Sequence, residues 1–226
     1  MKKNIIIILA AALTLLAVSC KKESAGVTRI TYYPTITLKG DNPLVISKGG
    51  SFADPGFEAE MNGEDVASQV KVDASGVDTS APGIYSVSYS MVNADGFTST
   101  VTRDVYVTNP GGIDNVYVSE CWMGARHYNG FPIVISLYQE GVYLIDDLCG
   151  GFYCFGRYPG YEPTYDFHAD TFFSLGADGS INVLQAGNWY FASQFDYSNI
   201  TGGYDASTGI FEYDFDGLGV KLVPLG

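Results

Sequence analysis

The chain has 226 residues with 12 Lys+Arg and 25 Asp+Glu, which gives a formal net charge of −13. Such an acidic surface repels phosphate backbones, so composition argues against nucleic acid as a partner. Hydrophobic residues make up 46% of the chain and Tyr and Phe are abundant, so packed domains are expected rather than disorder.

The first twenty residues have the pattern of a secretory signal. Two lysines precede an apolar run over Asn4–Val18, which is shorter than the roughly 20 residues that span a bilayer, and small residues lead to Cys20. The segment resembles a bacterial lipoprotein signal, although Ala17 stands where that family usually has Leu. The resemblance implies that residues 1–19 are removed and that Cys20 is lipidated.

Residues 20–30 form a polar stretch without periodicity, which predicts a tether between the lipid and the first domain. Lys21-Lys22-Glu23 resembles the charged sequences that direct some Bacteroidetes lipoproteins to the cell exterior. We therefore expect a lipid-anchored protein at the outer membrane or cell surface, with its folded part in water.

The segment 31–109 alternates between polar and apolar residues, most clearly over Tyr85–Ser90 and Thr100–Val107. Gly, Pro, Asn and Asp interrupt these runs at spacings of about ten residues, which is typical of a small β-sandwich. Asn109-Pro110-Gly111-Gly112 follows the last run, and residues 110–112 are predicted to be an interdomain linker.

Three stretches of this segment carry a family resemblance: Asp54–Phe57, Val77–Tyr85 and Arg103–Val107. Their order and spacing resemble the bacterial surface immunoglobulin-like domains that occur in tandem on exported proteins. Within them, Pro82-Gly83 is suited to a turn that leads into the strand after it. The resemblance implies an immunoglobulin-like sandwich that acts as a spacer or presentation module and performs no catalysis.

The remainder, residues 113–226, is rich in aromatic side chains, with 24 of the chain's 32. Turn sequences separate short runs with strand character, and about eight or nine antiparallel strands are expected, in a barrel or a two-layer sandwich. The predicted strands are Asn115–Glu120, Pro132–Gln139, Val142–Asp146, Gly151–Arg157, Thr171–Leu175, Ser180–Leu184, Asn188–Ala192, Ile210–Phe215 and Val220–Val223.

Two stretches of this half, Tyr143–Tyr153 and Gly203–Gly209, resemble the C-terminal β domain of small two-domain Bacteroides lipoproteins. The resemblance suggests a lipocalin-like strand count and implies no particular reaction. The sequence therefore predicts an all-β protein, with an immunoglobulin-like sandwich followed by a barrel-like or sandwich domain.

Aromatic side chains in a predicted loop form the main candidate binding site. Tyr158, Tyr161 and Tyr165 lie in a stretch rich in Gly and Pro, and Trp189 lies in a later strand-like run. Exposed rings can stack on the apolar faces of sugars or contribute to protein interfaces. The alternative is that these rings fill the interior of the domain, where large apolar side chains are usually found.

Besides Cys20, the chain has three cysteines: Cys121, Cys149 and Cys154. Export to an oxidising compartment permits a Cys149–Cys154 disulfide across a small loop. The alternative is that all three are buried and reduced, because disulfide geometry is demanding.

Asp166, His168 and Asp170 would share one face of an extended strand. One histidine and two carboxylates define no geometry by themselves, so we expect a solvated face and neither a metal nor a cofactor. His127 stands apart from any such group.

Taken together, these features predict a non-catalytic, membrane-anchored lipoprotein whose aromatic-rich C-terminal domain binds a glycan. The alternative is a protein-interaction or adhesin component of an envelope complex, and a glycan-active enzyme is a further hypothesis. With 25 acidic residues, pairs of carboxylates carry no weight as evidence for a glycosidase. No Gly-x-Ser-x-Gly, phosphate-loop or His-Glu-x-x-His motif is present.

Overall fold

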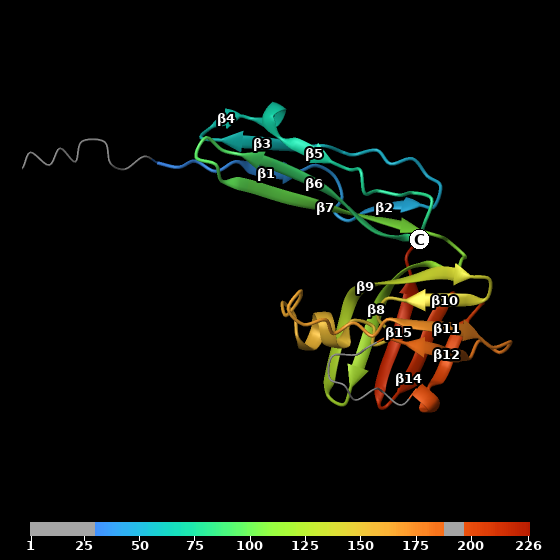
Figure 1. The fold of residues 1–226 in the computed structure, drawn as a ribbon. Helices are drawn as coiled ribbons and strands as arrows, with labels where there is room; N and C mark the ends of the chain where they lie inside the picture. Colours follow the sequence, from blue (N-terminus) through green and yellow to red (C-terminus); the bar gives the residue numbers. More distant parts are fainter. Residues whose placement is uncertain (1–29, 188–196) are drawn as a thin grey trace, which may run out of the picture. The chain divides into compact units, whose positions relative to one another are not determined.

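The computed structural model describes residues 30–187 and 197–226. The predicted signal peptide (1–19), Cys20 and almost all of the predicted tether lie outside the described residues. Within the described ranges, no helix has both the length and the apolar character needed to cross a membrane. Regular structure is almost entirely β-strand (Figure 1), which confirms the predicted all-β class.

The first part of the structure contains two small sheets, with strand orders β1-β3-β4 and β2-β7-β6-β5. β2 runs parallel to β7, whereas the other pairings are antiparallel. The elements are β1 (Thr35–Leu38), β2 (Leu44–Ser47), β3 (Phe57–Met61), β4 (Glu64–Asp65), the 3₁₀ helix η1 (Ala67–Gln69), β5 (Lys71–Asp73), β6 (Gly83–Val92) and β7 (Thr98–Thr108).

The two sheets enclose a common apolar core. Ile36 and Ala59 come from the first sheet, and Val87, Tyr89 and Val105 come from the second. Buried positions alternate with more exposed ones along β6 and β7, as the period of two in the sequence predicts. This alternation forms the predicted sandwich.

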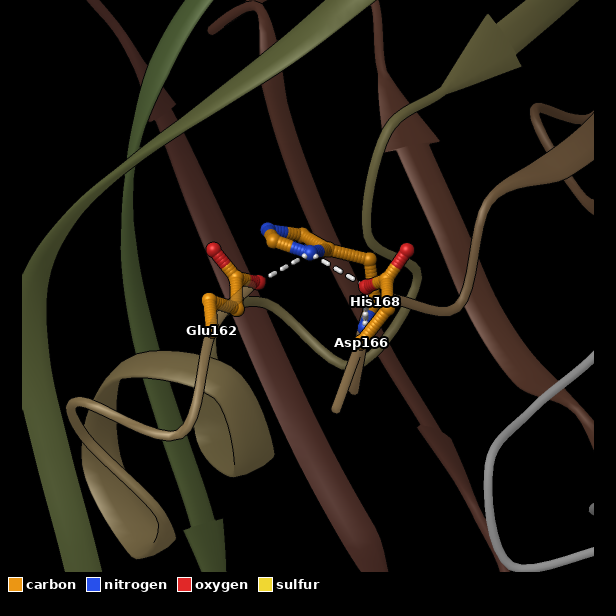
Figure 2. Close-up of side chains that lie close together, drawn as sticks. All are labelled: Glu162, Asp166 and His168. Carbon is orange, nitrogen blue, oxygen red and sulfur yellow. Dashed lines mark hydrogen bonds and ion pairs between the residues drawn. The ribbon is translucent and has the colours of Figure 1, made fainter. Parts of the chain in front are cut away.

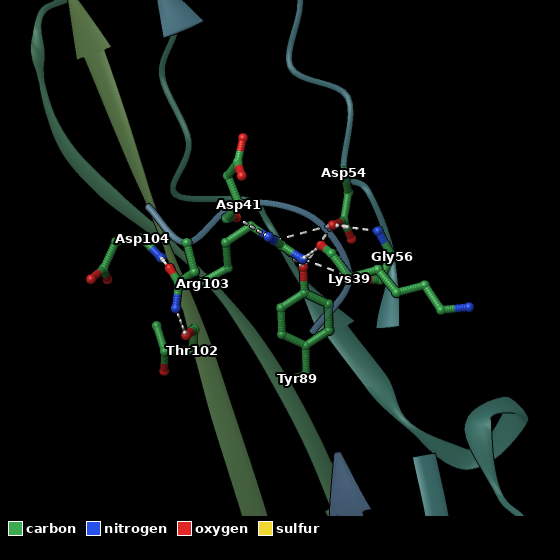
Figure 3. Close-up of polar contacts among 9 residues, drawn as sticks. Lys39, Asp41, Asp54, Gly56, Tyr89, Thr102, Arg103 and Asp104 are labelled. Atoms are coloured by element: carbon green, nitrogen blue, oxygen red, sulfur yellow. Dashed lines mark hydrogen bonds and ion pairs between the residues drawn. The ribbon is translucent and has the colours of Figure 1, made fainter. Parts of the chain in front are cut away.

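A fully buried arginine, Arg103, lies on the inward face of β7 (Figure 3). Its guanidinium group donates hydrogen bonds to the backbone carbonyls of Lys39 (2.6 Å), Asp41 and Gly56 (3.1 Å). The Asp54 carboxylate lies 3.5 Å from its Nε atom and accepts a hydrogen bond from the Gly56 N–H. Because buried charge is costly unless paired, this network explains why an arginine occupies an apolar face.

The second part of the structure is an eight-stranded antiparallel sheet with the order β12-β11-β10-β9-β8-β15-β14-β13. Its elements are β8 (Asn115–Met123), β9 (Arg126–Gln139), β10 (Val142–Ile145), the π-helix η2 (Phe152–Arg157), β11 (Thr171–Leu175), β12 (Ile181–Ala186), the 3₁₀ helix η3 (Tyr197–Asn199), β13 (Thr201–Asp205), β14 (Ile210–Phe215) and β15 (Leu218–Pro224).

The two edges of this sheet meet, so that it curls into a nearly closed barrel (Figure 1). Ser180, just before β12, forms a bridge with Gly203 of β13. The Tyr204 N–H donates a 2.8 Å hydrogen bond to the Gly179 carbonyl at the same seam. Of the two predicted architectures, barrel-like or sandwich, the structure therefore has the barrel-like one.

The strands of the barrel bury one face and expose the other. In β14, Phe211, Tyr213 and Phe215 point into the core, whereas Glu212 and Asp214 are exposed. This pattern of alternating aromatic and acidic residues lets an acidic chain have an aromatic interior. Other large core side chains include Tyr117, Ile133, Ile135, Leu148, Phe152 and Phe173.

One predicted strand is wrong. The segment Gly151–Arg157 is not extended, because it forms η2 and the turn before it. Gly151 has a φ of +82°, a left-handed conformation that favours glycine. β13 was not among the predicted strands, since its adjacent glycines obscure the pattern, and the predicted strand Asn188–Ala192 lies outside the described residues.

Candidate functional site

The long connection between β10 and β11, residues 146–170, contains most of the predicted site residues. We call it the β10–β11 loop. η2 opens it with hydrogen bonds of π type, from the Gly156 N–H to the Gly151 carbonyl (3.0 Å) and from the Tyr158 N–H to the Tyr153 carbonyl (2.9 Å). Such turns are rare and occur frequently at functional sites, which makes this loop the leading candidate site.

A buried carboxylate, Asp147, holds both ends of this loop. Its Oδ1 atom accepts hydrogen bonds from the N–H groups of Cys149 (2.9 Å) and Ala169 (3.1 Å). Its Oδ2 atom accepts from the Gly151 N–H (2.9 Å) and the Cys154 thiol (3.2 Å). Burial raises the pKa of Asp147, while these donors act in the opposite direction. Asp147 is therefore a structural group that fixes where the loop leaves and re-enters the barrel.

The three described cysteines, Cys121, Cys149 and Cys154, are free and buried. The structure has Cys149 and Cys154 as free thiols, and the Cys154 thiol donates a hydrogen bond to Asp147, so a Cys149–Cys154 disulfide stays a prediction for the oxidised protein. Burial raises the pKa of the Cys121 thiol to about 12, and the nearby Asp147 charge adds to the effect. A thiol with a raised pKa is a poor nucleophile, which agrees with the alternative of small, buried hydrophobic residues.

The structure brings together three of the four predicted ligand-binding residues. Tyr158, Tyr161 and Tyr165 surround Phe167, with centroid distances to Phe167 of 4.9, 5.9 and 6.4 Å respectively. We call these four residues the aromatic cluster. Phe167 is only 2% exposed, whereas Tyr161 is 50% and Tyr165 39% exposed. The cluster therefore has a buried base and an exposed aromatic rim.

The fourth predicted residue, Trp189, lies outside the described residues. Elsewhere in the loop, Phe152 is buried and forms part of the barrel core, as the alternative interpretation expected for some of these rings. The guanidinium carbon of Arg157 lies 5.2 Å from the centroid of the Tyr158 ring, so a cation borders the aromatic cluster on one side.

A histidine and two carboxylates of the β10–β11 loop meet one another (Figure 2). The Nδ1 atom of His168 lies 2.8 Å from Oε1 of Glu162 and 2.9 Å from Oδ1 of Asp166. The same Oδ1 atom accepts a 2.9 Å hydrogen bond from the His168 backbone N–H. We call Glu162, Asp166 and His168 the His168 cluster.

The protonated form of His168 is favoured by its surroundings. Burial opposes the charge, but the hydrogen bond with Asp166 and the negative charges of Asp147 and Glu162 outweigh that effect and raise the pKa of His168. Its ring also packs edge-on against Phe155, with centroids 5.6 Å apart. The imidazole is thus held in one orientation, with Nδ1 directed at the two carboxylates.

The His168 cluster differs from the group suggested by the sequence, which was Asp166, His168 and Asp170. Residues 166–170 do alternate between outward and buried positions, but the second acidic partner of His168 is Glu162 rather than Asp170. The Asp170 carboxylate lies against Gly187 instead. The other histidine, His127, pairs with the single carboxylate of Glu120 at 2.8 Å.

A depression lies at the barrel seam and is lined mainly by polar residues. Its two aspartates, Asp178 and Asp205, accept hydrogen bonds from the hydroxyl groups of Ser180 and Ser207, both at 2.7 Å. The same oxygen atoms also accept from the serine backbone N–H groups. These carboxylates stabilise turns, so the seam is a weaker candidate than the β10–β11 loop.

Comparison with known proteins places this architecture among bacterial surface proteins. A family model described as "Bacterial surface protein, Ig-like domain" matches residues 36–107, and a second model, described as a C-terminal domain, matches residues 75–220. No curated protein matches the chain. The second match begins inside the sandwich, so the boundary at residues 110–112 remains a prediction.

Among solved structures, the lipoprotein BT2262 from Bacteroides thetaiotaomicron is similar to this chain at 30% sequence identity. The TM-score is 0.60, and the alignment covers 84% of this chain and 98% of that one. The chain belongs to the family whose C-terminal-domain model matches residues 75–220, and it is related over most of its length to the lipoprotein BT2262. The predicted family resemblance is thereby confirmed.

Sequence reasoning missed two features of the site. The Tyr161 carbonyl accepts hydrogen bonds from the N–H groups of Thr164 (3.0 Å) and Tyr165 (3.1 Å), and this turn reverses the chain. The reversal brings Glu162 to His168, whereas an extended chain would have kept them apart. The role of Asp147 was also missed. An acidic residue two positions before Cys149-Gly150-Gly151 was a signal for side-chain capping of a turn.

Proposed function

We propose that this protein is a non-catalytic lipoprotein, anchored at the outer membrane through a lipid on Cys20, that binds a glycan through the aromatic cluster. The family assignment supports the surface setting, and the lipid and membrane follow from the signal-like first twenty residues. The observation that carries the glycan proposal is the exposed rim formed by Tyr161 and Tyr165 above a buried Phe167.

Such a rim has the chemistry that sugar recognition requires. A pyranose ring presents C–H groups on its faces and hydroxyl groups at its edge. Tyrosine rings supply the apolar contact, and their hydroxyl groups supply hydrogen bonds. The carboxylates of Glu162 and Asp166 lie next to the rim and can accept hydrogen bonds from sugar hydroxyl groups.

The structural use of the buried ionisable groups supports a non-catalytic role. Asp147 accepts four hydrogen bonds from the protein itself, and Cys154 donates one of them. Asp147 and Cys154 use these hydrogen bonds to hold the loop in place, and neither side chain is directed at a substrate. The loop then acts as a rigid platform for binding.

Native gel electrophoresis of the full-length protein in detergent tests the proposal. The gels would contain mucin glycans, xylan, pectin, arabinogalactan, starch or laminarin in turn. We expect at least one polysaccharide to retard the wild-type protein. Tyr161→Ala and Tyr165→Ala should each weaken the apparent affinity about three- to tenfold, the range expected for loss of one aromatic contact.

Tyr138→Ala is the matched control, because Tyr138 is 65% exposed on β9 and belongs to no part of the aromatic cluster. Its retardation should equal that of the wild type. Equal retardation of all three variants would overturn the site assignment. If no glycan retards the wild-type protein, the glycan proposal fails, and crosslinking in cells would test the alternative of a protein partner.

A further inference from the structure

We propose that Glu162, Asp166 and His168 form a binding site for a divalent transition-metal cation of the zinc type. The site stands independently of glycan binding, because it rests on the positions of three ligand atoms. Each residue offers one ligand atom, and these three atoms all lie within 4.8 Å of one another. Nδ1 of His168 faces Oε1 of Glu162 and Oδ1 of Asp166 (Figure 2).

The spacing of these atoms fits a cation with a small adjustment. Zinc bonds to nitrogen and oxygen ligands measure about 2.0–2.1 Å, so neighbouring ligands of a tetrahedral site lie roughly 3.3 Å apart. The Nδ1–oxygen distances are 2.8 and 2.9 Å, as expected for hydrogen bonds that a proton bridges. Replacing that proton with a cation requires the carboxylates to move outward by roughly half an ångström.

The carboxylates are free to make this movement. The side chain of Glu162 is 43% exposed and that of Asp166 is 77% exposed, whereas that of His168 is only 27% exposed. The Oδ2 atom of Asp166 offers a second ligand atom if Oδ1 keeps its bond to the His168 backbone. A fixed imidazole with two adjustable carboxylates on its solvent side gives a cation a route of entry.

The ligand types select the kind of cation. An imidazole nitrogen suits zinc and its first-row neighbours, whereas calcium takes six to eight oxygen ligands. Three protein ligands leave at least one coordination position for water or for an oxygen atom of a bound molecule. We therefore expect Zn²⁺ to bind and Ca²⁺ not to compete.

The sequence positions of the ligands give the site a structural consequence. Each ligand directly follows a member of the aromatic cluster in the chain, as Tyr161-Glu162, Tyr165-Asp166 and Phe167-His168. A cation that joins the three ligands therefore restrains the backbone next to three of the four rings. Metal binding would fix the geometry of the aromatic rim.

Isothermal titration calorimetry with ZnCl₂ tests this proposal. The sample is tag-free, full-length protein in detergent that has been stripped with EDTA and dialysed. We expect one saturable site in the wild type. Glu162→Gln and His168→Ala should each weaken zinc binding at least tenfold, because losing even a residue that supports a ligand costs about 10–100-fold. CaCl₂ added beforehand should leave the zinc isotherm unchanged.

Two variants serve as matched controls. Asp170→Asn removes an exposed carboxylate near His168 but outside the cluster, and His127→Ala removes the histidine that pairs with one carboxylate only. Both should bind zinc as the wild type does. Absence of a saturable site in the wild type, or equal affinity in Glu162→Gln, would overturn the proposal. Glu162→Gln alters an exposed side chain, so it keeps the test valid if His168→Ala fails to fold.

Gel retardation repeated with EDTA and with zinc separates this proposal from the glycan proposal. Zinc binding without glycan retardation would support the metal site and count against the glycan function. Retardation that EDTA does not change, in protein shown by calorimetry to bind zinc, would contradict the expected effect of the cation on the aromatic rim.

Discussion

At the scale of single residues, the buried Asp147 carboxylate accepts four hydrogen bonds. Both of its carboxylate oxygens accept two hydrogen bonds each inside the barrel. Asp147→Asn replaces one oxygen with an NH₂ group, which must then face existing donors whichever way the amide is turned. We expect a loss of about 3 kcal/mol in the free energy of unfolding, measured by urea denaturation.

Tryptophan fluorescence suits this measurement, because both tryptophans, Trp122 and Trp189, belong to the second half of the chain. Asp170→Asn is the control, since Asp170 is exposed in the same loop. An Asp147→Asn variant as stable as this control would show that the four hydrogen bonds add little to stability.

The neighbouring Asp146 should make stability depend on pH. Burial raises the pKa of its carboxyl group to about 6, and the Asp147 charge adds to this, although the Val134 N–H and the His168 charge oppose it. The folded state therefore holds a proton that the unfolded state releases near pH 4. This contribution to stability is present below about pH 4 and is lost as pH rises through about 6.

Asp146→Asn removes this titration and keeps an oxygen that can accept the hydrogen bond from Val134. We expect the variant to match the wild type near pH 4 and to exceed its unfolding free energy by about 2 kcal/mol at pH 7. Urea denaturation of both proteins between pH 4 and 8, with EDTA present, checks this. A stability difference that is the same at every pH would contradict the raised pKa.

At the scale of elements, closure of the barrel depends on two glycines. A Cβ atom at Gly203 would collide with the Gly179 carbonyl, and one at Gly179 would collide with the Tyr204 carbonyl. Gly203→Ala should push the seam apart and lower the unfolding free energy by about 1–3 kcal/mol in urea. Gly76→Ala is the control, because no atom lies within 4 Å of its added Cβ.

If Gly203→Ala and Gly76→Ala unfold at the same urea concentration, the seam accommodates the added Cβ atom without a loss of unfolding free energy. Hydrogen exchange gives a second measurement. In Gly203→Ala, the Tyr204 N–H should lose protection, because its bond to the Gly179 carbonyl is part of the seam.

The strand pattern shows where local sequence suffices for prediction. In β6 and β7, alternation of side chains decides which face is buried, and the predicted alternation is observed. The segment Gly151–Arg157 is rich in aromatic residues, which also favour strands, but it forms η2, because hydrogen bonds from outside the segment decide its conformation. The side chains of Asp147 and Ser119 bind Gly151 and Gly150 respectively, and neither contact is visible in the local pattern.

At the scale of the whole molecule, the all-β class follows from the sequence, whereas closure of the barrel does not. Among the described residues, closure depends on the bridge between residues 180 and 203 and the hydrogen bond between Tyr204 and Gly179, which join segments that carry no pairing signal. The same is true of the candidate site. The tyrosines could be predicted from their loop composition, but the meeting of Glu162 with His168 depends on how the loop turns.

The two ends of the β10–β11 loop are bonded to a single carboxylate, since Asp147 accepts from both Cys149 and Ala169. Gly151 and Cys154 also donate to Asp147, and Phe152 packs in the barrel core, so the part of the loop between the last anchor on each side is residues 155–168. Such an arrangement allows this part to be exchanged as a cassette, because new residues there leave the four hydrogen bonds to Asp147 intact. Loops held in this way on a rigid scaffold can change what they bind without a change of fold.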